Sequence, residues 1–207
     1  MKKYFYLVLL AVACETTEAE REDYFPLEIN KTLEYKVTET RYSAAAEPQR
    51  SVWYLKEVVG DTVGHVQGTP ILRWERYRKN SLDESWKIDS VWTVYKQVEK
   101  VVRVENNIPY VKLIIPPVEG QTWNGNTLNH LPNQTYKWVS AGEKLMDVVH
   151  AADSSLIHLN KSYERYQAGV GLIFKEVRVY SYCQSNPNCI GKKEIESGRD
   201  LLYELLP

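Results

Sequence analysis

The residues of this sequence best placed to form a covalent link are Cys183 and Cys189. They enclose Gln184 to Asn188, a segment rich in turn-forming residues, between two runs that alternate like β-strands. Two cysteines this close favour a disulfide if the chain reaches an oxidising compartment. Zinc binding and redox activity fit less well, because no second cysteine pair or nearby histidine is present and the spacing is not Cys-x-x-Cys. We therefore predict a structural disulfide between Cys183 and Cys189.

Histidines and carboxylates offer no complete catalytic or metal-binding motif. His150 and His158 fit adjacent antiparallel strands and would supply part of a metal site, but the spacing indicates no third ligand. A glycosidase needs a pair of carboxylates, and the acidic residues at hand fit a solvated strand face instead. These residues are Glu84, Asp89, Glu99 and Glu105. We therefore predict no catalytic residue, no metal ligand and no cofactor.

The N-terminus has the pattern of an export signal. Its apolar run, Tyr4 to Val12, is shorter than the roughly 20 residues of a membrane-spanning helix and fits a signal-peptide core of about 7–15 residues. Small residues then lead into Cys14, which resembles a bacterial lipobox, although Ala11 stands where a large aliphatic residue is usual. We predict a signal peptide at 1–13 and lipidation of Cys14. The alternative is an ordinary cleaved signal peptide.

Residues 14–23 are acidic and lack apolar periodicity, which indicates a solvated tether. They also resemble the acidic surface-export tags of Bacteroidota lipoproteins, and a plain spacer is the alternative. The longest later apolar stretch, Val111 to Val118, contains Lys112 and prolines, so we expect no second membrane segment. Acyl chains on Cys14 would then hold the protein at the outer membrane of the cell envelope, on its periplasmic side or at the cell surface.

Composition narrows the class of protein. The 207 residues are 43% hydrophobic and 26% charged, which suits a folded domain with a real core. The charges balance, with 26 Lys+Arg against 27 Asp+Glu and a net charge of -1. Sequence-independent binding of nucleic acid is therefore not expected. No Pro/Ser-rich linker interrupts residues 24–207, which predicts a single domain over that range.

Apolar and polar residues alternate from residue 32 onward, as they do in β-strands. The clearest runs cover 32–37, 51–59, 71–79, 86–95, 98–104, 110–115, 135–140, 145–151, 155–163, 172–182 and 194–205. No long amphipathic helix accompanies them, which argues against a parallel α/β fold. We predict an all-β protein with a single large, strongly curved antiparallel sheet or open half-barrel of about ten strands.

The aromatic residues favour Tyr and Trp, with 15 Tyr and 6 Trp but only 3 Phe. Such side chains suit a surface that is half apolar and half wet, although β-sheets favour aromatic residues in any case. Trp86 and Trp92 are separated by an even number of positions in a single expected strand, so we expect their side chains to face the same side of the sheet. Together with Trp74 they form our candidate ligand face.

Three motifs, in order along the chain, suggest a family. Tyr24 to Leu27, with Leu33 to Tyr35 after it, resembles the first strand of a group of Bacteroidota lipoproteins of unknown function. Leu113 to Pro116 and then Gly120 to Gly125 are similar to the middle motif of that group. Tyr163 to Leu172 is similar to its late strand. The resemblance implies an all-β, curved-sheet domain behind a lipid anchor, and it brings no known activity. A looser likeness, in architecture alone, is to periplasmic lipoprotein carriers whose concave face holds acyl chains.

These observations favour a non-enzymatic β domain that is anchored by lipid and binds a lipid, a glycan or a partner protein on a concave aromatic face. One alternative is an envelope hydrolase with a carboxylate or histidine site, which a cluster of buried acids with perturbed pKa values would favour. Another is a structural subunit of an envelope assembly, which an exposed apolar patch or an unpaired sheet edge would favour.

Overall fold

The structure is a computed structural model that describes residues 22–207, and these residues form twelve β-strands and no helix. The strands are β1 (Thr32–Ser43), β2 (Ala46–Val66), β3 (Thr69–Lys79), β4 (Lys87–Gln97), β5 (Lys100–Glu105), β6 (Ile108–Ile114), β7 (Thr122–Asn124), β8 (Thr135–Gly142), β9 (Leu145–Ser154), β10 (His158–Gln167), β11 (Gly171–Tyr182) and β12 (Ile195–Leu205). Within this range, no helix has the length and apolar character needed to cross a membrane.

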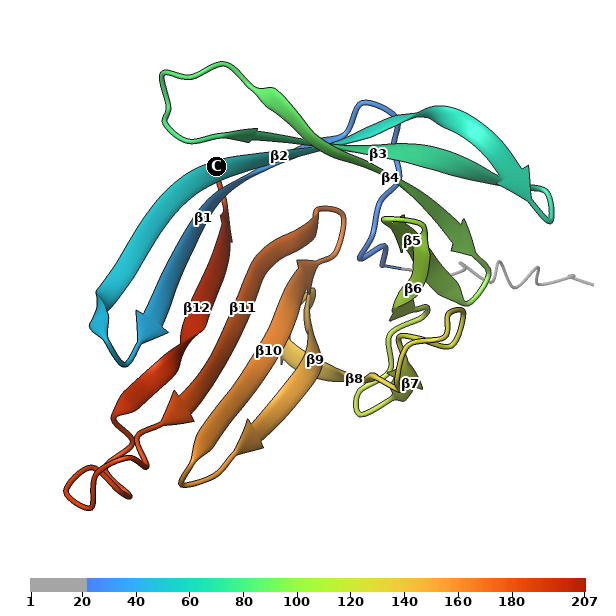
Figure 1. Ribbon diagram of the computed structural model, residues 1–207. Helices are drawn as coiled ribbons and strands as arrows, with labels where there is room; N and C mark the ends of the chain where they lie inside the picture. Colours follow the sequence, from blue (N-terminus) through green and yellow to red (C-terminus); the bar gives the residue numbers. More distant parts are fainter. Residues whose placement is uncertain (1–21) are drawn as a thin grey trace, which may run out of the picture.

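All twelve strands belong to one antiparallel sheet, in the order β6-β5-β4-β3-β2-β1-β12-β11-β10-β9-β8-β7. Each strand pairs with the next one in the chain, except that β6 and β7 form the two edges of the sheet, and the first strand pairs with the last. The sheet curls so strongly that it is nearly a closed barrel (Figure 1). The predicted all-β fold on one large, curved antiparallel sheet is confirmed. The additional strands include β7, whose three residues are too few to show an alternating pattern.

Local irregularities help the sheet to bend. Register shifts interrupt most of the strand pairs, and such bulges increase the local twist of a sheet. Gly198 in β12 is a second irregularity. Its φ is +143°, and a Cβ atom there would collide with the backbone carbonyl of Val179 on β11. Only glycine therefore allows β11 and β12 to approach each other at this point.

Side chains close the seam between the two edge strands, β6 and β7. The indole Nε1 of Trp123 donates a hydrogen bond to the Val111 carbonyl at 3.0 Å, and Trp138 Nε1 donates to the Ile114 carbonyl at the same distance. The Asn129 side chain donates to the Pro109 carbonyl at 2.7 Å. These donors satisfy carbonyls that an open edge would leave unpaired.

The segment before β1 fills one end of the curled sheet with aromatic side chains. Tyr24 and Phe25 are buried, and the Phe25 ring lies 5.5 Å from Trp74 and 6.3 Å from Tyr166. Asp23 holds the segment in place through an ion pair with Lys96 at 2.7 Å. These rings belong to the larger of two apolar core clusters, and the smaller one contains Tyr35, Val37 and Leu55.

The hairpin of β11 and β12 carries the two cysteines at its turn. Cys183 and Cys189 form a disulfide with a Cα–Cα distance of 5.8 Å. The predicted pairing is confirmed.

Candidate functional site

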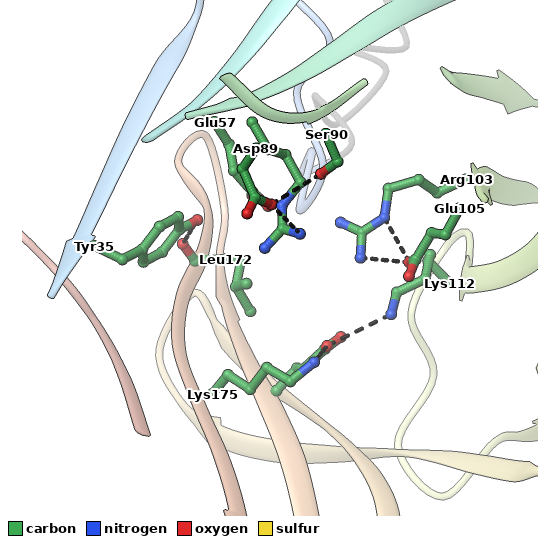
Figure 2. Close-up of polar contacts among 11 residues, drawn as sticks. Tyr35, Glu57, Asp89, Ser90, Arg103, Glu105, Lys112, Leu172 and Lys175 are labelled. Carbon is green, nitrogen blue, oxygen red and sulfur yellow. Dashed lines mark hydrogen bonds and ion pairs between the residues drawn. The ribbon is translucent and has the colours of Figure 1, made fainter. Parts of the chain in front are cut away.

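The inner face of the sheet carries a cluster of charged side chains next to the aromatic end. The alternation of each strand directs these residues inward, and burial then forces them to pair. Figure 2 shows the side chains of Arg103, Lys112 and Lys175 converging on the same space from different strands. We call the following set the inner cluster: Arg103, Glu105, Lys112, His150, Glu164 and Lys175.

Glu164 on β10 is the hub of the inner cluster, and its side chain is only 2% exposed. Its Oε1 atom lies 2.8 Å from Lys175 Nζ and 3.5 Å from Lys112 Nζ. Its Oε2 atom accepts a hydrogen bond from the Tyr166 hydroxyl at 2.8 Å. Burial alone would raise the pKa of Glu164, but the positive charges of Lys112 and Lys175 outweigh it and hold the pKa well below its ordinary value.

Arg103 and Glu105 form a second pair within the inner cluster. Arg103 Nε and Nη2 contact Glu105 Oε1 at 2.8 and 2.7 Å. Burial opposes ionisation of Glu105, yet Arg103 and Lys112 together lower its pKa to about 2. We expected Glu105 on a solvated face, and this is wrong: its side chain is 23% exposed and belongs to the interior.

His150 lies at the edge of the inner cluster on β9. Its ring stacks on Tyr136 with 4.1 Å between centroids, and its Nε2 atom lies 3.5 Å from Glu164 Oε2. Burial lowers the pKa of His150 despite the nearby carboxylate, so the neutral ring is favoured at neutral pH.

Aromatic rings border the inner cluster on the side of β3 and β4. The guanidinium groups of Arg76 and Arg103 lie over the Trp92 ring, 4.2 and 5.0 Å from its centre. Arg76 also pairs with Glu57 at 3.0 Å. The buried indole Nε1 atoms of Trp74 and Trp92 have no hydrogen-bond partner among the described residues. Buried donors without a partner are uncommon in folded proteins, and a ligand acceptor is one way to satisfy them.

Trp86 does not share this inner face, and our prediction for it is wrong. Lys56 alternates with Leu55 and Glu57, which are buried inside, so Lys56 projects outward. The Lys56 ammonium lies 4.9 Å from the centre of the Trp86 ring, which places Trp86 outside. The cause is a bulge: the pairing of β3 with β4 shifts between Arg76 and Tyr77, and the extra residue in β4 reverses the alternation.

The two histidines considered for a metal site are not brought together. His150 faces the inner cluster, whereas His158 Nε2 lies 2.6 Å from Asp153 at the β9–β10 turn. Across residues 22–207, no group of three or more His, Cys, Asp or Glu side chains is arranged to hold a metal ion. Gly169 and Gly171 form the turn between β10 and β11, both with positive φ, as expected for a bend.

A small cavity of about 20 Å³ lies between the aromatic end and the charged region. Phe25, Val59, Trp74 and Leu172 supply its apolar wall, and Glu57 and Arg103 border it with charge. Its volume holds about one water molecule. Apolar and charged surfaces therefore meet inside the sheet.

Sequence reasoning missed most of the inner cluster because a charged residue on a strand normally faces water. One signal was available: Lys112 interrupts the nearly continuous apolar run of β6. Cys14, the predicted lipidation site, and the signal peptide lie outside the described residues. Comparison with protein-family models, curated proteins and solved structures finds no match for this chain.

Proposed function

We propose that this protein is a non-enzymatic binding protein of the cell envelope, held at the outer membrane through lipidated Cys14, that takes a small organic ligand on the concave inner face of its sheet. The ligand would lie against Trp74 and Trp92 and beside the inner cluster. A lipid or a glycan fits this face better than a protein, because the charged groups lie inside the curl. No nucleic acid and no cofactor are expected.

The observation that carries the proposal is the polar interior itself. Charged side chains lose their hydration when they are buried, and a buried ion pair often contributes no net stability in return. Apolar side chains could fill the same space without this cost. The sheet instead places charged residues from β5, β6, β10 and β11 around one space, with the unpartnered indole donor of Trp92 nearby. Aromatic walls with a few polar groups are the composition typical of ligand sites. Because the cavity of about 20 Å³ holds only about one water molecule, an organic ligand requires the surrounding side chains to move apart.

The interior carboxylates are buried and their pKa values are perturbed, which is the feature expected of the hydrolase alternative, but the direction of the shift favours binding. A glycosidase needs one carboxylic acid whose pKa is raised so that it can donate a proton. The pKa values of Glu105 and Glu164 are both lowered, so both stay ionised at neutral pH. The structural-subunit alternative would require an unpaired sheet edge. The carbonyls of Val111 and Ile114 on the edge strand β6 are already bonded by tryptophan side chains, so this edge gives little support to assembly through strand pairing.

Native mass spectrometry of the full-length protein purified from envelope membranes tests the proposal. We expect an additional bound mass in the wild type that decreases in Trp92→Ala and persists in Trp86→Ala, the matched change on the outer face. Circular dichroism checks that both variants fold, and Trp92→Phe replaces Trp92→Ala if the latter does not. Equal retention of the bound mass in the Trp92 and Trp86 variants would overturn the proposal.

A further inference from the structure

The inner cluster contains more positive than negative charge. Its basic side chains are Arg103, Lys112 and Lys175, and its carboxylates are Glu105 and Glu164. Burial lowers the pKa of Lys112, so a nearby anion would favour the charged form of this side chain. Beside the inner cluster, Arg76 pairs with Glu57 at 3.0 Å and with the more exposed Asp89 at 3.6 Å, so both of these carboxylates are engaged by Arg76. One positive charge of the inner cluster is therefore left without a carboxylate of its own.

The excess charge falls on Lys112. Its side chain is 7% exposed, and among residues 22–207 its ammonium has one polar contact, at 3.5 Å to Glu164 Oε1. That oxygen is already bound more closely by Lys175, at 2.8 Å. An ammonium group has three donors, so Lys112 is poorly satisfied for a buried charge. Uncompensated buried charges are strongly unfavourable.

The other polar groups near Lys112 do not supply the acceptors that its ammonium lacks. Glu105 is engaged by two nitrogens of Arg103. The hydroxyls of Tyr35 and Tyr166 donate their protons to the Leu172 carbonyl and to Glu164. The His150 ring is neutral in its favoured state and adds no negative charge.

We propose that Lys112 and Lys175 form a subsite for an oxyanion group of the ligand, either a carboxylate or a phosphate. This inference rests on the proposed function and names the chemistry of its ligand. The Lys175 side chain is 24% exposed and that of Lys112 is 7% exposed, so Lys175 is the more accessible of the two ammonium groups. Hydrogen bonds between ammonium groups and such oxygens are short and strong when both partners are charged.

Titration calorimetry on the full chain with four probes tests this subsite. Acetate and inorganic phosphate represent small free ions, decanoate carries a carboxylate on an apolar chain, and decanol is its uncharged counterpart. Lys112→Met removes the charge at similar length. Lys137→Met is the control, because Lys137 is exposed on β8. Lys175→Met serves as a second variant if Lys112→Met does not fold.

We expect decanoate, phosphate or both to bind the wild type and Lys137→Met equally, and at least about tenfold more weakly in Lys112→Met, which corresponds to about 1.4 kcal/mol. Binding of decanoate without phosphate or acetate indicates an amphiphile, and binding of phosphate alone indicates a soluble ion. Equal binding of decanol and decanoate, or no loss in Lys112→Met, would overturn the oxyanion subsite and leave the proposed function standing. The proposed function fails on a different result: equal retention of the co-purified mass in Trp92→Ala and in Trp86→Ala.

Discussion

Lys112 on β6 contacts Glu164 on β10 at 3.5 Å, although these strands are not neighbours in the sheet. The contact crosses the interior, 52 residues apart in the chain. It exists only because the sheet curls until its edges approach each other. The curvature and the inner cluster are therefore parts of one arrangement.

Glu164→Gln should strongly destabilise the protein. The substitution leaves the buried Lys112 and the half-buried Lys175 with no carboxylate between them, and breaking a buried ion pair by removing one partner costs about 3–5 kcal/mol. Urea denaturation measures this loss. The control Glu204→Gln, at an exposed position on β12, should change stability by less than about 0.5 kcal/mol. Similar, small effects of both changes would contradict the assigned role of Glu164.

The stability of the protein should fall in acid partly because of Glu105. Its folded pKa of about 2 lies below the ordinary value of 4.5, so its contribution is fully present above pH 4.5 and is lost as the pH falls toward 2. Denaturation midpoints measured from pH 6 to pH 2 should therefore decline. The decline should be shallower in Glu105→Gln, and an identical slope in both proteins would be evidence against the pairing with Arg103.

The alternating pattern of the sequence was enough to predict most strands, the curved sheet and the cysteine hairpin. It failed at the residue in β4 where a bulge reverses the alternation and carries Trp86 outside. It also could not reveal the inner cluster, because Glu164 and Lys175 alternate just as solvent-facing residues do. Their partners come from strands that are distant in the sequence, and only the closure of the sheet brings them together.

Loss of the disulfide should weaken the β11–β12 turn without disrupting the rest of the sheet. In the double variant Cys183→Ser, Cys189→Ser, the short loop loses a cross-link whose chain-entropy contribution is about 2 kcal/mol. Thermal melts under non-reducing conditions measure the difference. Addition of a reductant should lower the melting temperature of the wild type and leave the double variant unchanged. A wild-type melting temperature insensitive to a reductant that demonstrably frees both thiols would contradict this role.

Cys14→Ser should release the protein from membranes. The predicted acyl chains on Cys14 are the only membrane attachment that we expect, so the variant should lose fatty-acid labelling and move to the soluble fraction. Metabolic labelling followed by membrane fractionation gives the answer, with Cys183→Ser as the control that keeps its label. Labelling and membrane retention that persist in Cys14→Ser would rule out this anchor.

A crystal structure of the protein purified from its native envelope, without added ligand, tests most directly whether the concave face binds a ligand. We expect continuous density for an organic molecule beside Trp92, with an oxygen atom within hydrogen-bond distance of Lys112 Nζ. An inner face that contains only separate water molecules, in protein whose bound mass was detected beforehand by mass spectrometry, would show that the ligand binds elsewhere and contradict the proposal.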